Sequence, residues 1–178
     1  MEKQTNEPEL LPLEPGTSHL IFLKKKLLHQ SFEGSDGSGK LIMTFSRPRS
    51  WSRNANGFWH DGEVHFRYPK WYSRRVEVNI HGLAEQPTVA RKFFWRADHI
   101  QWFNHRLTFV QKGFFLRHYQ LIDQDEQVVL DWHITERFLS FRLESTNDGR
   151  IFKLPHPEAL NLLCLFLILQ RIRDAQAS

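Results

Sequence analysis

The segment ALNLLCLFLIL at residues 159–169 decides the fold of this chain of 178 residues, because it is apolar on every face except at one asparagine. Pro157 lies just before it, and proline suits the first turn of a helix, where its missing N–H costs nothing. Arg171 and Arg173 follow, and positive charge near a helix C-terminus interacts favourably with the helix dipole. The sequence therefore predicts a helix over residues 157–173.

This helix is too short to cross a membrane and too uniformly apolar to lie on a membrane surface. Its apolar run spans roughly 16 Å, whereas the hydrocarbon core of a bilayer is about 30 Å thick. A helix on a membrane surface would carry one polar face. A helix that is apolar all round is normally surrounded by protein. We therefore expect no transmembrane span, and we expect this helix to be buried inside the domain.

Residues 19–154 form a series of short segments with the pattern of β-strands. In RVEVNI at 75–80, for example, apolar side chains alternate with polar ones, which is typical of a strand with one buried face. About ten to twelve such segments follow one another at a spacing of about 8–12 residues. Connections this short favour antiparallel pairing, since parallel strands need longer crossovers. The predicted fold class is all-β with one C-terminal helix, a closed antiparallel barrel of about 10–12 strands around the buried hydrophobic helix.

The charge divides the chain into two parts. Residues 1–18 contain three prolines and four glutamates against one lysine, which predicts a flexible acidic tail whose leucines are able to dock on the domain. Residues 19–178 are expected to be a single β-barrel domain. The tail sums to −3 and the whole chain to +4, so the barrel carries +7. A basic body attracts anionic surfaces such as phospholipid or nucleic acid, although charge also serves plain solubility.

The single cysteine and the N-terminus bear on the compartment. Cys164 lies within the apolar helix, and one thiol cannot form an intrachain disulfide. The N-terminal residues lack the basic and apolar regions of a signal peptide. We therefore expect a cytoplasmic protein, either free or peripheral to a membrane.

The layout resembles the tubby C-terminal-like superfamily, which includes tubby proteins, phospholipid scramblases and LURP-one-related plant proteins. The resemblance rests on the strand series 19–154 and the helix ALNLLCLFLILQRI at 159–172, and it is one of layout rather than of signature residues. It implies a barrel wrapped around a C-terminal helix, with phosphoinositide or acidic phospholipid as the ligand class. The sequence departs from the scramblases in having no cysteine-rich palmitoylation cluster and no acidic calcium-loop pattern.

Two stretches of the sequence combine cationic residues with aromatic ones. Arginine forks suit phosphate, and Trp or Tyr stacks on bases or lies at the headgroup layer of a membrane. Pro48 and Pro69 indicate loops or strand edges. The alternative is that the aromatic side chains close the barrel rim while the arginines are solvated. We expect an acidic phospholipid surface, ahead of nucleic acid, as the partner of these candidate binding residues: Arg47, Arg49, Trp51, Arg53, Lys70, Trp71, Arg74 and Arg75.

Other motifs predict neither an enzyme nor a bound metal or cofactor. GSDGSGKL at 34–41 matches a phosphate loop superficially, but a strand follows it in place of a helix, so it predicts a hairpin turn. Ten histidines are scattered without the spacing of a zinc site, and the acidic run at 123–126 lacks the pattern of a calcium loop. No catalytic constellation is found. An alternative function is a lipocalin-like small-molecule carrier, with the helix packed outside a hollow barrel.

Overall fold

The described residues of the computed structural model form a closed barrel of twelve antiparallel strands, as the sequence predicts. Each strand pairs with the next along the chain, and β12 returns to pair with β1, so no sheet edge is left open. The structure describes residues 9–24, 30–49, 52–70, 73–91, 97–113, 116–137 and 140–176. The strands are β1 (His19–Lys24), β2 (Gln30–Asp36), β3 (Leu41–Arg47), β4 (Ala55–Trp59), β5 (Gly62–Arg67), β6 (Arg75–Ile80), β7 (Thr88–Arg91), β8 (Ala97–Trp102), β9 (His105–Lys112), β10 (His118–Ile122), β11 (Val128–Arg137) and β12 (Ser140–Thr146).

Alternation along the strands sends apolar side chains into the barrel. In β6, Val76, Val78 and Ile80 are buried, while the residues between them are exposed. The register that closes the barrel pairs His19 with Thr146, so the first strand lies beside the last. A short 3-10 helix, η1 (Arg150–Lys153), then leads the chain back across one end of the barrel into its interior.

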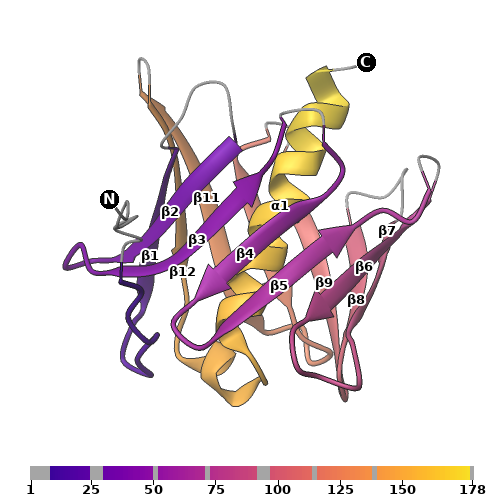
Figure 1. Ribbon diagram of the computed structural model, residues 1–178, viewed down its shortest axis with the longest axis horizontal. Helices are drawn as coiled ribbons and strands as arrows, with labels where there is room; N and C mark the ends of the chain where they lie inside the picture. The colour runs from indigo at the N-terminus through magenta and orange to yellow at the C-terminus, as the bar shows by residue number, and fades with distance from the viewer. Residues whose placement is uncertain are drawn as a thin grey trace, which may run out of the picture.

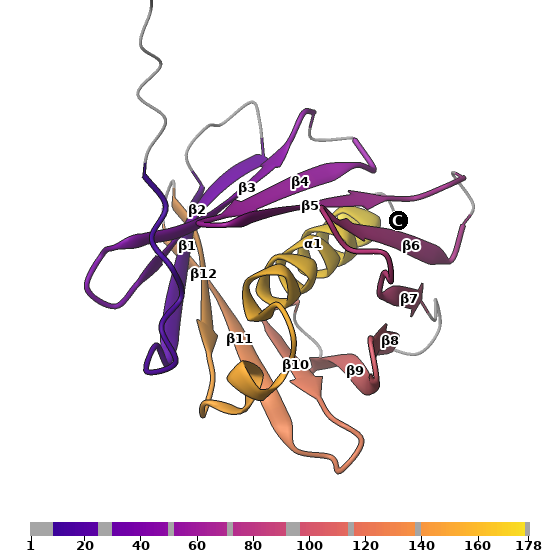
Figure 2. The ribbon, with the colours of Figure 1, turned by 60° about the horizontal axis from the view of Figure 1, so that its bottom comes forward.

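Helix α1 (Pro157–Gln176) runs through the barrel and is three residues longer than predicted. Figure 1 shows it passing behind β3, β4 and β5, and Figure 2 shows strands around it on several sides. Every residue from 159 to 170 is buried, which confirms the prediction of a buried hydrophobic helix. Burial also raises the pKa of the Cys164 thiol, because a thiolate would have to leave water. Among the described residues, no helix has both the length and the apolar character that crossing a bilayer requires.

The helix contacts the barrel wall closely on its β4 and β5 side. A Cβ atom built on Gly57 would lie 2.7 Å from Cδ1 of Leu162, so glycine is what allows this approach. The ring of Phe166 stacks on Phe66 with a centroid separation of 5.0 Å. The polar exception in the apolar run, Asn161, accepts a hydrogen bond from the Ser145 hydroxyl at 3.1 Å. The buried amide therefore has a partner.

Residues 9–18 lie along the barrel, whereas the sequence predicts a flexible tail over the whole of 1–18; residues 1–8 are outside the described residues. The Leu11 amide donates to the Leu41 carbonyl at 2.9 Å, and Nδ1 of His60 lies 2.9 Å from the Leu10 carbonyl oxygen. Leu13 is buried in the core cluster. The leucines thus dock as the sequence allowed, and the packed part of the chain begins before His19.

Substituting Gly57 with alanine should destabilise the fold, because the added methyl group overlaps Leu162 and also lies 3.2 Å from Cγ1 of Val64. We expect the free energy of unfolding to fall by about 1–3 kcal/mol, the usual cost of overpacking a core. Chemical denaturation measures this value. Gly37→Ala is the matched control, since nothing lies within 4 Å of a Cβ at that position. Equal stability of the two variants would contradict close packing between β4 and α1.

Candidate functional site

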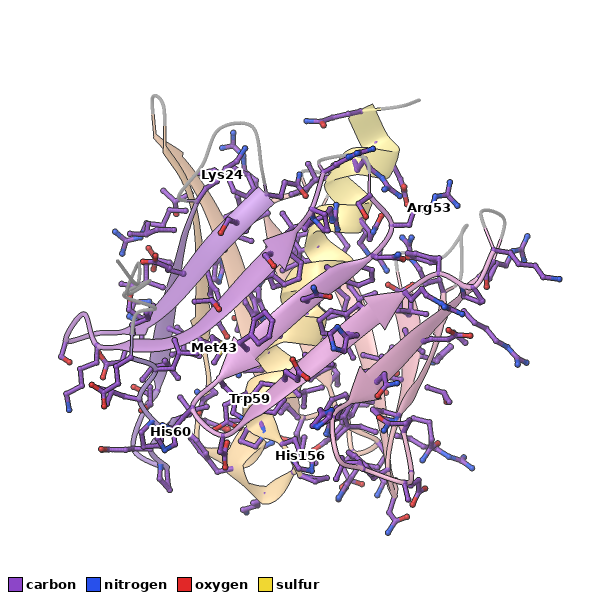
Figure 3. The ribbon with its side chains drawn as sticks, viewed as in Figure 1. Lys24, Met43, Arg53, Trp59, His60 and His156 are labelled. Carbon is purple, nitrogen blue, oxygen red and sulfur yellow. The ribbon has the colours of Figure 1, made fainter. Side chains whose placement is uncertain are left out.

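Positive charge gathers at the end of the barrel where helix α1 ends. The loops after β3 and β5 reach this end, as do the starts of β6 and β8 and the last turn of the helix. In Figure 3, Lys24 and Arg53 lie at this end, and His60 and His156 lie at the other. We call it the basic end and define it by Lys24, Arg47, Arg49, Arg53, Lys70, Arg74, Arg75, Arg91, Lys112, Arg117, Arg171 and Arg173.

The opposite end of the barrel has the opposite character. Its hairpins and the start of helix α1 carry Asp36, Asp61, Glu85, Asp123, Asp125, Glu126, Asp148 and Glu158. Lys40, Arg106, Arg150 and Lys153 also lie there, so acidic and basic groups are mixed. Among the described residues of the basic end, by contrast, the carboxylates that face the helix terminus are Asp98 and Asp174. The barrel therefore has an electrostatic polarity along the helix axis.

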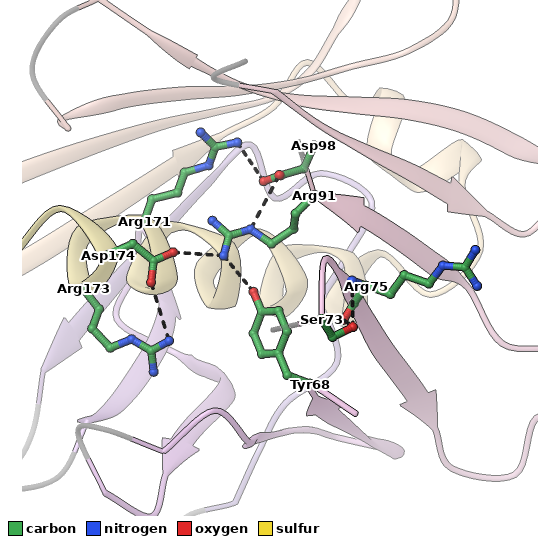
Figure 4. A network of polar contacts seen from close by, with 8 residues as sticks. All are labelled: Tyr68, Ser73, Arg75, Arg91, Asp98, Arg171, Arg173 and Asp174. Atoms are coloured by element: carbon green, nitrogen blue, oxygen red, sulfur yellow. Dashed lines mark hydrogen bonds and ion pairs between the residues drawn. The ribbon is translucent and has the colours of Figure 1, made fainter. Parts of the chain in front are cut away.

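Both predicted basic stretches reach the basic end, but their residues do not form one surface. Arg49, Lys70 and Arg74 are exposed, and Arg53 is half-buried. Arg75 begins β6 and points away from the helix terminus (Figure 4). It lines a groove of about 990 Å³ over β5, β6 and β7 on the barrel wall. Trp51 and Trp71 are outside the described residues.

Arg47 differs from the expectation of a surface arginine, because its side chain points into the barrel and is 1 % exposed. Met43, Phe45 and Arg47 occupy alternate positions of β3, so the same alternation that buries the first two buries the arginine. Its guanidinium lies 5.5 Å from the ring centre of Phe166, and its three nitrogens have no hydrogen-bond partner among the described residues. Burial, and next the charge of Arg173, lower the pKa of Arg47 to about 10.

A second buried polar group lies on the helix near this arginine. Gln170 follows Phe166 by four residues, so the two share one face of the helix. Gln170 is fully buried, and neither its amide nitrogen nor its oxygen has a hydrogen-bond partner among the described residues. Buried polar groups in folded proteins are nearly always satisfied. Arg47 and Gln170 together leave unused hydrogen-bond donors inside the basic end.

The last turn of the helix is tied to the barrel wall by a polar network (Figure 4). Arg171 donates to Asp98 at 2.7 Å, and Asp98 is 1 % exposed. Arg91 lies 3.6 Å from the other oxygen of Asp98 and donates to Asp174 at 3.1 Å. It also donates to the Tyr68 hydroxyl at 2.9 Å. The network thus joins β7 and β8 to the helix terminus.

Among the side chains that the structure describes around the helix terminus, positive charge exceeds negative charge. The guanidiniums of Arg47, Arg91, Arg171 and Arg173 stand against the carboxylates of Asp98 and Asp174. Burial acts to lower the pKa of Arg91, but Tyr68, Asp98 and Asp174 outweigh it, so the pKa is raised and Arg91 stays charged. Burial raises the pKa of Tyr68, so its hydroxyl is neutral near pH 7 and supports Arg91 there by accepting its hydrogen bond, not by a compensating charge. Part of the surplus is balanced by the dipole at the helix C-terminus.

Sequence reasoning missed Arg91, Asp98 and Asp174 as partners in this site. It assigned Arg171 and Arg173 only to the helix dipole. The signal was present in the predicted fold: a helix inside a barrel must bring its last turn to the barrel mouth, where strand ends meet it. What the sequence does not contain is the register that selects which strand ends those are.

The segments at 34–41 and 123–126, which the sequence analysis compared with a phosphate loop and a calcium loop, are hairpin turns in the structure. The Asp36 carboxylate accepts hydrogen bonds from the Ser38 hydroxyl at 2.7 Å and from backbone amides, and these bonds lower its pKa. The phosphate-loop match at 34–41 therefore joins β2 to β3. Likewise, Asp123 accepts from the amides of Asp125 and Gln127 within the turn that joins β10 to β11.

Two of the histidines that are scattered in the sequence come together with an aspartate in the structure. His118, Asp131 and His133 place their potential ligand atoms within 4.8 Å of one another on the wall of the barrel. The three residues are 13 and 2 positions apart in sequence, which is not a zinc-motif spacing. Strand pairing, rather than local sequence, brings them together.

Comparison with known proteins places the chain near one solved structure. No family model matches it, and no curated protein matches it. It is similar to a protein of Arabidopsis thaliana known from X-ray crystallography, with 13% sequence identity and a TM-score of 0.47. The match covers 88% of this chain and 96% of the Arabidopsis chain.

Removing the charge of Asp98 should weaken the fold strongly. Asp98→Asn leaves Arg171 and Arg91 without the buried anion that faces both. We expect a loss of about 3–5 kcal/mol in the free energy of unfolding, as for other broken buried ion pairs. Asp125→Asn, in an exposed turn, is the control and should change stability by less than about 0.5 kcal/mol. A small effect at Asp98 would show that the network does not hold the helix terminus.

Replacing Arg47 should have the opposite effect on stability. Arg47→Met keeps an unbranched side chain against Phe166 and removes a buried cation whose nitrogens lack partners. We expect the free energy of unfolding to rise by about 1–3 kcal/mol, the cost of an unsatisfied buried polar group. Thermal and chemical denaturation without added anions measure it. Arg106→Met, at an exposed position, is the control. If Arg47→Met lowers the free energy of unfolding and Arg106→Met does not, the interpretation of Arg47 as a buried cation without a partner is contradicted.

Proposed function

We propose that this chain is a non-enzymatic barrel that binds acidic phospholipid surfaces through its basic end. The observation that carries the proposal is the surplus of positive charge among the described residues around the helix terminus. Arg47 is buried beneath it, and its guanidinium has no hydrogen-bond partner within that described part of the chain. Buried guanidinium nitrogens without hydrogen-bond partners carry a desolvation cost that an anionic ligand is able to offset. A phosphate-bearing headgroup supplies the acceptor oxygens that guanidinium donors suit.

The exposed cations and the buried ones have different parts in this proposal. Arg49, Lys70 and Arg74 are exposed, so they lie on a surface that a charged membrane can reach. Each cation near an anionic bilayer surface contributes about 1 kcal/mol to binding. Arg47 and the network arginines lie in a less polar medium, where charge is screened less than at the surface.

The position of helix α1 supports a site on the outside of the barrel. A carrier of the lipocalin kind, the alternative expected from sequence, holds its ligand in an open lumen. Here residues 159–170 of the helix lie in the interior and are buried. The loops and the barrel mouth are the surfaces that remain for a ligand. This favours the headgroup proposal over the carrier.

We also propose membership of the tubby C-terminal-like superfamily, on layout alone. Twelve antiparallel strands followed by one C-terminal helix inside the barrel are the features on which the resemblance rests. Acidic phospholipid is the ligand class that this resemblance implies. The location that fits this proposal is the cytoplasm, with peripheral association to a membrane.

Vesicle sedimentation tests the proposed function. The full chain is mixed with vesicles of phosphatidylcholine alone, or with added phosphatidylserine or phosphatidylinositol bisphosphate, at low and at high salt. We expect retention on the acidic vesicles only, and its loss at high salt as the charges are screened. Changing Arg49, Arg53, Lys70 and Arg74 together to alanine should weaken retention at least about 10-fold.

A charge-matched control separates this site from general basicity. The quadruple variant Lys40→Ala, Arg106→Ala, Arg150→Ala and Lys153→Ala removes equal charge from the opposite end. It should bind acidic vesicles as the unchanged chain does. Equal losses in both quadruple variants, or equal retention on neutral and acidic vesicles, would overturn the proposal. Tighter binding of the chain to a polyanionic oligonucleotide than to the acidic vesicles would also overturn the proposal.

A further inference from the structure

A pair of histidines and an aspartate lie together on the outer wall of the barrel, away from the buried network. His118 on β10 is directly opposite His133 on β11 in the strand register. Asp131 precedes His133 by two residues, so both side chains project from the same face of β11. Leu130 and Trp132 alternate with them and are buried in the barrel. The three polar side chains therefore face outward as one cluster.

The distances within the cluster suit shared ligation. Nε2 of His118 lies 2.6 Å from Oδ1 of Asp131, and Nε2 of His133 lies 3.6 Å from Oδ2 of the same carboxylate. The two imidazole rings are stacked, with centroids 4.3 Å apart and planes 14° from parallel. The side chains of His118 and Asp131 are 34% and 30% exposed, and that of His133 is 53% exposed. The cluster is open to solvent and within reach of an ion.

We propose that His118, Asp131 and His133 bind a divalent transition-metal ion of the zinc class. Two imidazole nitrogens and one carboxylate oxygen are ligands that this class prefers, and three protein ligands leave one tetrahedral position for water. The His118 and His133 nitrogens are already next to one carboxylate. To converge on an ion about 2.0–2.1 Å from each nitrogen, the near-parallel rings must turn about their Cβ–Cγ bonds. Their exposure leaves room for that rotation.

The next strand adds a further carboxylate to this face. Glu144 on β12 is directly opposite His133. Its carboxylate is held by Arg142 at 2.7 Å and by His19 at 3.2 Å. These contacts occupy the Glu144 carboxylate, so it flanks the cluster without filling the fourth position. The site spans β10 and β11, with β12 flanking it.

Metal binding here has a structural consequence. An ion held by His118 and His133 links two adjacent strands across their pair, and it binds the folded chain only, since the ligands come together through strand register. Such binding raises the unfolding temperature in proportion to the logarithm of ion concentration. The proposed metal site is independent of the basic end, because none of the three metal ligands is among the residues that define that end.

The test uses the full chain without a polyhistidine tag. Calorimetric titration with ZnCl2 at neutral pH should give one ion per chain, and the unfolding temperature should rise by several degrees with excess zinc. MgCl2 should cause neither effect, because magnesium prefers oxygen ligands. Lowering the pH should release zinc, since imidazole binds metal only in its neutral form. CoCl2 should give visible absorption bands of a nitrogen- and oxygen-ligated ion.

Variants with equal numbers of histidines separate this site from weak surface binding. His118→Gln with His133→Gln should abolish the zinc response, and Asp131→Asn should weaken binding at least about 10-fold. His65→Gln with His99→Gln, at exposed positions elsewhere on the wall, should bind zinc as the unchanged chain does. A zinc response that survives in the His118 and His133 double variant, or its absence in the unchanged chain, would overturn the proposal and leave an ordinary histidine–carboxylate pair.

Discussion

Burial of helix α1 inside the barrel is the constraint on which the rest of the structure depends. An apolar helix of this kind has no stable place in water, and the twelve strands have no other filling for their inner faces. Each needs the other, so strand alternation, the glycine at position 57 and the hydrogen bond between Ser145 and Asn161 all serve one interface. The same burial removes the lumen from the surfaces where a ligand can bind.

The helix also decides where charge collects. Its last turn emerges at one mouth of the barrel, and its C-terminal dipole favours cations there. The strands that end at that mouth contribute Arg47 and Arg91, and among the described residues Asp98 alone offers a deeply buried carboxylate. The arrangement balances the network arginines only in part. The surplus of positive charge at the mouth is therefore a consequence of the topology, and it is also the feature on which the proposed binding depends.

The layout of the fold was predictable because it depends on local pattern. A run of eleven residues with one polar member predicts a buried helix, and alternation with a period of two predicts strands. Neither prediction requires knowing which segments contact each other. Clusters of charged side chains were predictable only where they are contiguous in sequence, as in the loops that carry Arg49 and Arg74. Arg47 was placed on the surface because composition was weighed above alternation, although its register with Met43 and Phe45 pointed inward. The pairing of His118 with His133 requires a cross-strand register, which single-sequence pattern does not contain.

The two candidate sites differ in what they cost the stability of the fold. On the outer wall, the cluster of His118, Asp131 and His133 is solvated, so it costs the fold little whether or not an ion is bound. Inside the basic end, Arg47 and Gln170 have buried polar atoms without partners, and that cost is borne by the fold at all times. A core that is otherwise closely packed and apolar had aliphatic residues available for both positions. Solubility therefore does not explain the polarity of these two buried residues, whereas it does explain the charge of the more numerous exposed cations.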